Sequence, residues 1–247
     1  MRTRRGRARI GALVPFTNTN LEPDLALLCP DGITLHFARM GGYDADEIPD
    51  EGQMRGLGDS DLEEPLHLLC GALPDVVLYG CTSATLTHGR KFDADLAARI
   101  KDKSGAHTVT AAGALVHALE TLEVKRIGFA SPYVPAINDD AIRFLKDAGF
   151  DTVARADVSE TLDNTGQGAM TPEAVQELGL RADTEAVEAI VLSCTDMRSV
   201  EAISDIEQAL GKPVITSNQA MVFQGLQLIG INDPVPGYGQ LLERERS

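Results

Sequence analysis

The chain has 247 residues, 43% of them apolar, and a formal net charge of −15. This length allows one large domain or two smaller ones with cores of their own. The acidic balance argues against a nucleic-acid partner, because proteins that bind DNA neutralise its phosphates with Lys and Arg. Five arginines crowd the first nine residues, and we interpret them as a solvated terminus without a function.

Short apolar runs alternate with helical patterns along the whole chain. The apolar runs predict strands buried on both faces, at residues 10–14, 33–37, 76–79, around Val109, 127–130, 152–154, 189–192 and 214–215. The helical patterns cover residues 61–73, 92–103, 113–122, 136–148, 172–180, 184–188, 200–210 and 219–230. Such alternation is typical of an α/β protein with parallel, doubly wound sheets.

Two segments read almost as copies of each other, and each is an apolar run that ends in cysteine and threonine. They are residues 76–82, which contain Cys81, and residues 189–195, which contain Cys194. Two further pairs match in the same order and at similar offsets, namely residues 9–15 with 126–132 and residues 109–116 with 215–222. Three ordered matches indicate an internal duplication.

The duplication predicts two pseudo-symmetric doubly wound lobes with the active site in the cleft between them. We assign residues 1–120 to the first lobe and residues 121–225 to the second. Residues 226–247 are expected to pack back on the first lobe. No run approaches the roughly 20 apolar residues of a membrane span, and residues 10–14 are too short for a secretory signal. We expect a cytoplasmic protein with no membrane partner.

Cys81 and Cys194 each end a predicted strand, at the edge where parallel sheets bind their ligands. Small polar residues follow both cysteines, and a helix N-terminus at such a place favours an anion. We therefore expect each turn to hold a carboxylate and to lower the pKa of its thiol. Cys29 and Cys70 are interpreted as small core residues. The spacing of the four cysteines predicts no metal site and fits a reducing compartment.

Two other features are interpreted without a catalytic role. The acidic stretch at residues 44–51 is interpreted as a solvated loop, with a mobile lid as the alternative. His88 follows the Cys81 turn. We interpret it as a residue without a role at the site, and support of that turn is the less favoured alternative.

Five motifs together resemble the aspartate/glutamate racemase superfamily, and within it the branch of maleate cis-trans isomerases and arylmalonate decarboxylases. They are residues 9–22, the turn at residues 80–85, Ser131-Pro132-Tyr133, Leu162-Asp163-Asn164 and Ser193-Cys194-Thr195. The resemblance covers nearly the whole chain, and the motifs occur in the expected order.

The resemblance implies an enzyme that needs no cofactor and no metal, acts on a small carboxylate and forms a homo-oligomer, either a dimer or a tetramer. By position, Cys81 would be the nucleophile and Cys194 the acid and base that handles the proton. The positions that hold substrate carboxylates in the family match Asn18, Tyr133 and Asn164. Further donors are expected from Thr82, Ser83 and Thr195.

Departures from the family patterns favour the isomerase. Arylmalonate decarboxylases carry glycine at the position of Cys81, and the amino-acid racemases follow each cysteine with Asn-Thr. Here Cys81 is present, and the turns continue with Thr82-Ser83 and Thr195-Asp196. The leading hypothesis is a maleate isomerase. The alternatives are a racemase of aspartate, glutamate, a hydantoin or an ectoine-breakdown compound, a decarboxylase, and a small-acid binding protein without activity.

The polar turn after Cys194 has two interpretations. Asp196 and Arg198 make it more polar than a maleate isomerase leads us to expect. Arg198 would bind a second carboxylate and Asp196 an amino group, or the two would form a solvated charge pair at a helix start.

Overall fold

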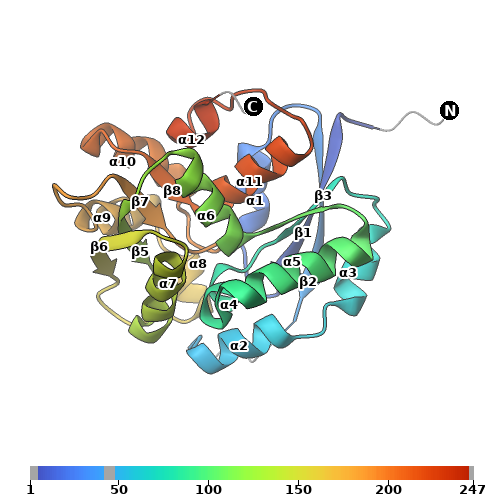
Figure 1. Ribbon diagram of the computed structural model, residues 1–247, viewed down its shortest axis with the longest axis horizontal. Helices are drawn as coiled ribbons and strands as arrows, with labels where there is room; N and C mark the ends of the chain where they lie inside the picture. Colours follow the sequence, from blue (N-terminus) through green and yellow to red (C-terminus); the bar gives the residue numbers. More distant parts are fainter. Residues whose placement is uncertain (1–4, 42–47, 245–247) are drawn as a thin grey trace.

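The computed structural model describes residues 5–41 and 48–244, and within these ranges eight strands form two parallel sheets (Figure 1). The first sheet has the order β2-β1-β3-β4 and the second the order β6-β5-β7-β8. The strands are β1 (Ala8–Pro15), β2 (Ile33–Met40), β3 (Val76–Tyr79), β4 (His107–Thr110), β5 (Arg126–Ser131), β6 (Asp151–Asp157), β7 (Ala189–Leu192) and β8 (Val214–Thr216). The same order in both sheets confirms the duplicated α/β fold, and all eight predicted strands are present.

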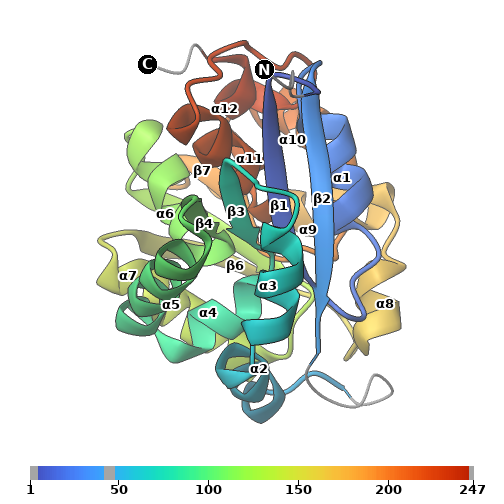
Figure 2. The same cartoon turned by 90° about the vertical axis from the view of Figure 1, so that its right-hand side faces the viewer.

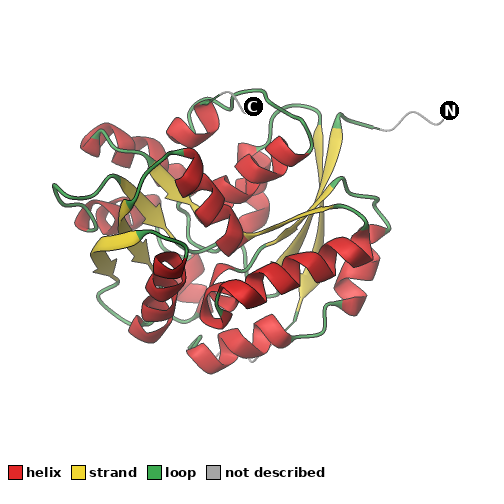
Figure 3. Ribbon diagram, in the orientation of Figure 1, coloured by secondary structure: helices red, strands yellow, loops and turns green. Residues whose placement is uncertain are grey.

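Helices cover both faces of each sheet (Figure 3). They are α1 (Leu21–Leu28), α2 (Glu51–Asp59), α3 (Glu63–Cys70), α4 (Thr82–His88), α5 (Arg90–Ser104), α6 (Ala111–Thr121), α7 (Pro135–Asp147), α8 (Asn164–Gly168), α9 (Pro172–Arg181), α10 (Ile203–Leu210), α11 (Ser217–Leu228) and α12 (Gly239–Glu243), with a 3₁₀ turn at Val200–Ala202. Among the described helices, none is long and apolar enough to cross a membrane.

The differences from prediction concern short helices. Helices α1, α2, α4, α8 and α12 are not predicted, and each has fewer than ten residues. Such lengths give too few turns for an apolar stripe to repeat. Residues 184–188, predicted as helical, form a turn in which Val187 N donates to Thr184 O at 3.1 Å before β7 begins. That prediction was wrong because the pattern extends over little more than one helical turn.

Helices α6 and α11 join the two lobes. Helix α11 comes from the second half of the chain but contacts β3 and β4 of the first sheet, while α6 contacts β8 of the second. The two helices also pack on each other, and one apolar core includes residues of both sheets. Figure 2 shows β1, β2 and β3 of the first sheet with α11 behind them. The two lobes are therefore built on a shared core.

The C-terminal segment runs over this junction. Helix α12 contacts α11, α10 and β8, and Arg244 donates to Thr121 O at the end of α6 at 3.2 Å. The lobe boundaries at residues 120 and 225, and the packing of residues 226–247, stay predictions.

Candidate active site

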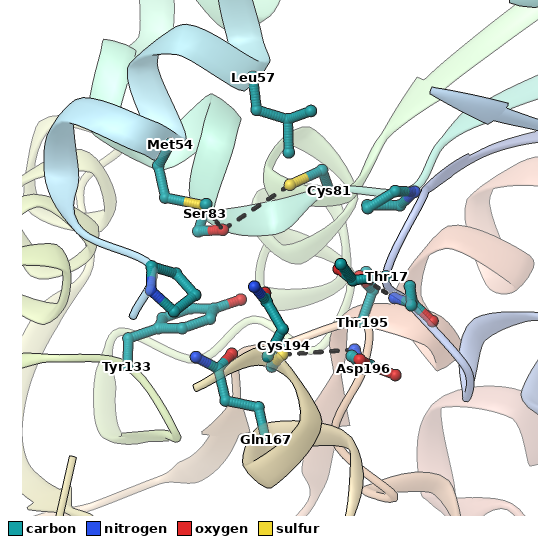
Figure 4. A pocket seen from close by; sticks show the side chains of 14 residues that line it. Thr17, Met54, Leu57, Cys81, Ser83, Tyr133, Gln167, Cys194, Thr195 and Asp196 are labelled. Carbon is teal, nitrogen blue, oxygen red and sulfur yellow. Dashed lines mark hydrogen bonds between the residues drawn. The ribbon is translucent and has the colours of Figure 1, made fainter. Parts of the chain in front are cut away.

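A pocket lies at the carboxyl ends of the strands and takes residues from both halves of the chain (Figure 4). Parallel sheets place ligands at this edge. Its lining consists of Pro15, Thr17, Asn18, Pro49, Met54, Leu57, Cys81, Ser83, Tyr133, Asn164, Gln167, Cys194, Thr195 and Asp196. The pocket thus brings together seven of the eight predicted site residues.

Cys81 is placed by the end of β3. Gly80 lies so close to its neighbours that an added Cβ would sit 2.9 Å from Leu13 O and 2.2 Å from Leu21 Cδ2. Only glycine allows this approach. Cys81 is then the N-cap residue of α4, and its Sγ lies 3.7 Å from Ser83 Oγ. The thiol is therefore held at a helix N-terminus.

Cys194 occupies the matching place after β7. Asp196 N donates to Cys194 Sγ at 3.3 Å, and Thr195 Oγ1 donates to Gly80 O at 2.9 Å. The second contact ties the Cys194 turn directly to the residue before Cys81. Figure 4 shows Cys81 and Cys194 on opposite sides of the pocket, with the Tyr133 ring reaching toward the space between them.

The expected lowering of both thiol pKa values was wrong for the pocket as it stands. Both cysteines are almost completely buried, at 5% and 4% exposure. Loss of water disfavours the thiolate, so burial raises the pKa of Cys81 and raises that of Cys194 to about 12. The helix N-terminus acts in the predicted direction but is outweighed by burial.

The two thiols differ in what opposes this rise. At Cys81, the Ser83 hydroxyl and the backbone N–H groups of Ser83 and Ala84 favour the thiolate. At Cys194, hydrogen bonds from Tyr133 and Asp196 N favour it, whereas the charges of Asp196 and Cys81 add to the rise. Only hydrogen bonds act on Cys81 against burial, whereas at Cys194 two like charges add to the effect of burial.

Tyr133 supplies a hydroxyl between the two cysteines. Its N–H donates to Ser131 Oγ at 3.1 Å, and its hydroxyl is hydrogen-bonded to Cys194 and Ser83. Burial raises the pKa of Tyr133 well above its usual value. The side chain therefore stays protonated and serves as a donor.

Asn18 and Thr195 form a polar pair across the cleft. Asn18 Nδ2 donates to Thr195 Oγ1 at 3.0 Å, while Asn18 Oδ1 accepts from Leu21 N at 2.9 Å at the start of α1. Asn164 approaches from α8, whose start is capped by Asp163 through Gly166 N at 2.6 Å. These two amides reach the pocket from two different segments, and Thr195 reaches it from a third.

Thr82 is the predicted site residue that does not line the pocket. Its Oγ1 donates to Ser217 Oγ at 2.9 Å, and the side chain is 1% exposed. It faces the buried side of the turn, away from the pocket.

Helix α2 covers the Cys81 side of the pocket, so the interpretation of residues 44–51 as a plain loop misses an element of the site. Of that stretch, residues 44–47 lie outside the described ranges, and Asp50 caps α2 by accepting from Gln53 N at 2.8 Å. Met54 and Leu57 line the pocket, and Met54 Sδ accepts from Ser83 Oγ at 2.8 Å. The sequence shows no signal for this role beyond the capping pattern.

His88 supports α2 rather than touching either thiol. Its Nε2 lies 2.9 Å from Arg55 O in α2, and its ring stacks on Phe92 at 3.9 Å between centroids. The less favoured interpretation gave His88 a supporting role at the Cys81 turn, and these contacts place its support at α2 instead.

Asp196 and Arg198 do not pair with each other. Asp196 Oδ1 accepts from Thr19 N at 2.8 Å and Asn20 N at 3.1 Å, so it holds the loop before α1. Arg198 pairs with Glu201 at 2.8 Å on the surface. Among the described lining residues, Asp196 is the only carboxyl, and none is Lys, Arg or His. A bound carboxylate would therefore be held by neutral donors.

The described ranges contain no group of three or more His, Cys, Asp and Glu side chains able to hold a metal ion.

Asp24 is a buried carboxyl behind the Cys194 turn. It is 3% exposed and accepts from Asn218 Nδ2 at 2.7 Å. Burial raises its pKa from 3.8 to about 7, against the opposing effect of the Asn218 hydrogen bond. The folded protein therefore binds a proton here that the unfolded chain releases between pH 4 and 7.

Replacement of Asp24 by Asn is expected to stabilise the protein at pH 8 but not at pH 4. A raised carboxyl pKa gives stability at low pH that is lost as pH rises through the folded value, with an upper limit of about 4 kcal/mol for this shift. Urea unfolding at the two pH values measures the difference in unfolding free energy between the two proteins. The contributions of the other titrating groups are common to both proteins and cancel in this difference. An equal difference at both pH values would contradict the assignment.

The chain is similar to maleate isomerases and to an arylmalonate decarboxylase. The family model described as arylmalonate decarboxylase matches residues 10–242. The maleate isomerase of Pseudomonas putida is 28% identical, over 95% of this chain and 96% of its own length. The arylmalonate decarboxylase of Bordetella bronchiseptica is 27% identical, over 94% and 92%.

Solved structures agree with the sequence comparisons. The maleate isomerase from Pseudomonas putida S16 superposes with a TM-score of 0.87 at 26% identity, covering 96% of this chain and 98% of that one. A Nocardia farcinica maleate cis-trans isomerase mutant gives the same TM-score and coverage at 25% identity. That mutant, with a cysteine replaced by serine, carries a covalently bound succinylcysteine intermediate.

Proposed function

The chain belongs to the arylmalonate decarboxylase family, and from this premise we propose that it is a cofactor-independent cis-trans isomerase of a small dicarboxylate, with maleate as substrate. The observation that carries the proposal is the pair of buried cysteines on opposite sides of one pocket. One thiol is needed to bond to carbon and another to deliver the proton. The similarity to maleate isomerases over almost the full length supports the same activity.

In the first step, the Cys81 thiolate adds to one carbon of the double bond. The π electrons move to the other alkene carbon, where the adjacent carboxylate takes up the charge, and the Cys194 thiol gives its proton to that carbon. The product is a succinyl group on Cys81, whose central bond is now single. The adduct contains every atom of the substrate and the proton from Cys194.

Rotation about this single bond turns the cis arrangement into the trans one. The Cys194 thiolate then removes a proton from the carbon that was protonated, the double bond forms again, and the carbon–sulfur bond breaks. Fumarate leaves, Cys81 returns as a thiolate, and Cys194 returns as a thiol. The different surroundings of the two thiols support this division of roles.

The neutral donors of the pocket stabilise the charge that develops on the substrate. Negative charge builds up on carboxylate oxygens during addition, and a fixed donor at such a place is worth about 3 kcal/mol. We assign carboxylate binding to Asn18, Tyr133, Asn164, Ser83 and Thr195, which line the pocket. Thr82 has a supporting role through its bond to Ser217.

The proposal is tested by incubating the protein in D₂O with maleate, aspartate, glutamate, hydantoins and 2-substituted malonates while following each by NMR. Conversion of maleate to fumarate is the expected result. Exchange at an α-carbon of an amino acid would instead identify a racemase, and release of CO₂ from a malonate would identify a decarboxylase. Either of these results without maleate turnover would replace the proposal.

We place this reaction in the cytoplasm, in a homo-oligomer. All four cysteines are free thiols, which a reducing compartment preserves. Leu27 in α1 and Leu68 in α3 expose large apolar side chains on helices that contact the edge strand β2, which suits contact with a second copy. Light scattering of the purified protein distinguishes a dimer or tetramer from a monomer.

A further inference from the structure

The first turn of α11 contacts the segments that carry both cysteines. Ser217 Oγ accepts from Thr82, the residue after Cys81, at 2.9 Å. Asn218 Nδ2 donates to the backbone carbonyl of Thr195, the residue after Cys194, at 3.1 Å. Ser217 and Asn218 are both completely buried, yet neither lines the pocket. One helical turn therefore touches both cysteine-bearing turns from behind.

Asn218 is fixed in orientation by what surrounds it. Its amide nitrogen faces two acceptors, Asp24 Oδ2 at 2.7 Å and Thr195 O at 3.1 Å. A flipped amide would place its oxygen against both acceptors. Its Oδ1 is buried and has no hydrogen-bond partner among the described residues. Burying this oxygen without a partner costs free energy. The two bonds made by the nitrogen offset that cost and hold the side chain in this orientation.

The duplicated half offers an internal comparison. Helix α6 starts like α11: Thr110 caps it by accepting from Gly113 N at 3.0 Å, as Thr216 caps α11 through Gln219 N at 3.1 Å. The next two residues in α6 are Ala111 and Ala112, at the positions of Ser217 and Asn218. A helix start of this kind therefore needs neither polar side chain.

We propose that Asn218, held by Asp24, is a positioning residue that fixes the backbone of the Cys194 turn against the Cys81 turn, with Ser217 as its companion on the Cys81 side. The inference rests on the proposed function only for its kinetic readout. Asn218 acts by donating to Thr195 O, and Asp24 acts by holding the amide in the donating orientation. The spacing of the two thiols is thereby set from one point.

Isosteric exchange tests this proposal. Asn218→Asp removes the donor to Thr195 O, and we expect kcat for maleate at pH 9 to fall about 10²-fold, because small misplacements of reacting groups have effects of this size. KM is expected to change less than kcat. The matched control is Gln219→Glu, since Gln219 is equally buried and donates to Tyr238 O at 2.6 Å, away from both cysteine turns. Its kcat is expected to stay within about twofold of the wild type.

The double exchange Asp24→Asn with Asn218→Asp separates positioning from stability. It restores a hydrogen bond between positions 24 and 218 with its direction reversed, so thermal stability is expected to recover. No donor to Thr195 O returns while the new carboxyl is ionised, so kcat at pH 9 stays low. Relative to wild type, kcat is expected to rise as pH falls and this carboxyl gains a proton to donate.

Full activity of the double exchange at pH 9 would overturn the proposal. So would a loss of kcat in Asn218→Asp no larger than in Gln219→Glu. If Asn218→Asp does not fold, Asn218→Ala, which copies Ala112, replaces it, and wild-type kcat in that variant would equally overturn the proposal.

A readout without turnover keeps this inference separate from the proposed function. Iodoacetamide alkylation of Cys194 is followed against pH in a Cys81→Ser background, with and without Asn218→Asp. We expect the alkylation profile to shift to higher pH when the turn is released and a carboxylate is placed near it. An unchanged profile would overturn the inference. If the wild type leaves maleate unchanged, the proposed function fails and this profile alone decides the inference.

Discussion

Replacing Cys194 by alanine is expected to reduce kcat for maleate on the order of 10⁴-fold or more, the size of loss found when one member of a coupled catalytic unit is removed. Burial raises the pKa of Cys194 to about 12, so at neutral pH the side chain holds the proton that the carbon must receive. Alanine has no proton to give. Initial rates of fumarate formation by absorbance or NMR measure the loss.

A matched control separates this effect from a general effect of losing a thiol. Cys70 ends α3 and does not line the pocket. Cys70→Ser is therefore expected to keep wild-type turnover. Substantial turnover in Cys194→Ala with an intact fold would contradict the assignment of Cys194 as the proton donor.

Replacing Cys81 by alanine is expected to abolish turnover to a similar degree but for a different reason. No sulfur is then available to bond to the substrate, so the double bond is never converted to a single bond and rotation stays blocked. The pocket keeps Asn18, Tyr133 and Asn164, so the variant is still expected to bind maleate. Calorimetric titration together with the rate assay distinguishes lost chemistry from lost binding.

Wild-type turnover in Cys81→Ala would exclude covalent addition at this residue. Loss of both maleate binding and turnover would show that Cys81 is needed for the shape of the pocket. The expected combination is binding without turnover. It assigns Cys81 to the chemical step.

The sheets and the two cysteines were predictable because both depend on local pattern. Apolar runs of four to eight residues mark strands buried on both faces, and the runs before Cys81 and Cys194 resemble each other because two equivalent turns share the same packing. Two strand ends of one kind then predict two thiols at one cleft. The resemblance to a known family added the amides and Tyr133, which spacing alone does not single out.

Other parts of the site depend on contacts distant in sequence. Helix α2 covers Cys81 through Met54 and Leu57, and nothing in its nine residues indicates a pocket. Gln167 reaches the site from α8, a five-residue helix too short to predict. The thiol pKa values were predicted in the wrong direction because a sequence shows the helix N-terminus but not the degree of burial.

The polar turn after Cys194 also required the structure. Asp196 resembled a residue that recognises an amino group, but its carboxylate accepts N–H groups of Thr19 and Asn20 across the cleft. Arg198 turns to Glu201 on the surface. The asymmetry between the two turns therefore contributes to holding the lobes together.

The central claim, that Cys81 bonds to carbon while Cys194 supplies the proton, is tested most directly by locating the bond. Cys194→Ser protein is incubated with maleate, digested and mapped by peptide mass. We predict that the mass of one substrate molecule is added to the peptide containing Cys81 and to no other cysteine peptide. An adduct on another cysteine, or full turnover without any adduct, would contradict the account.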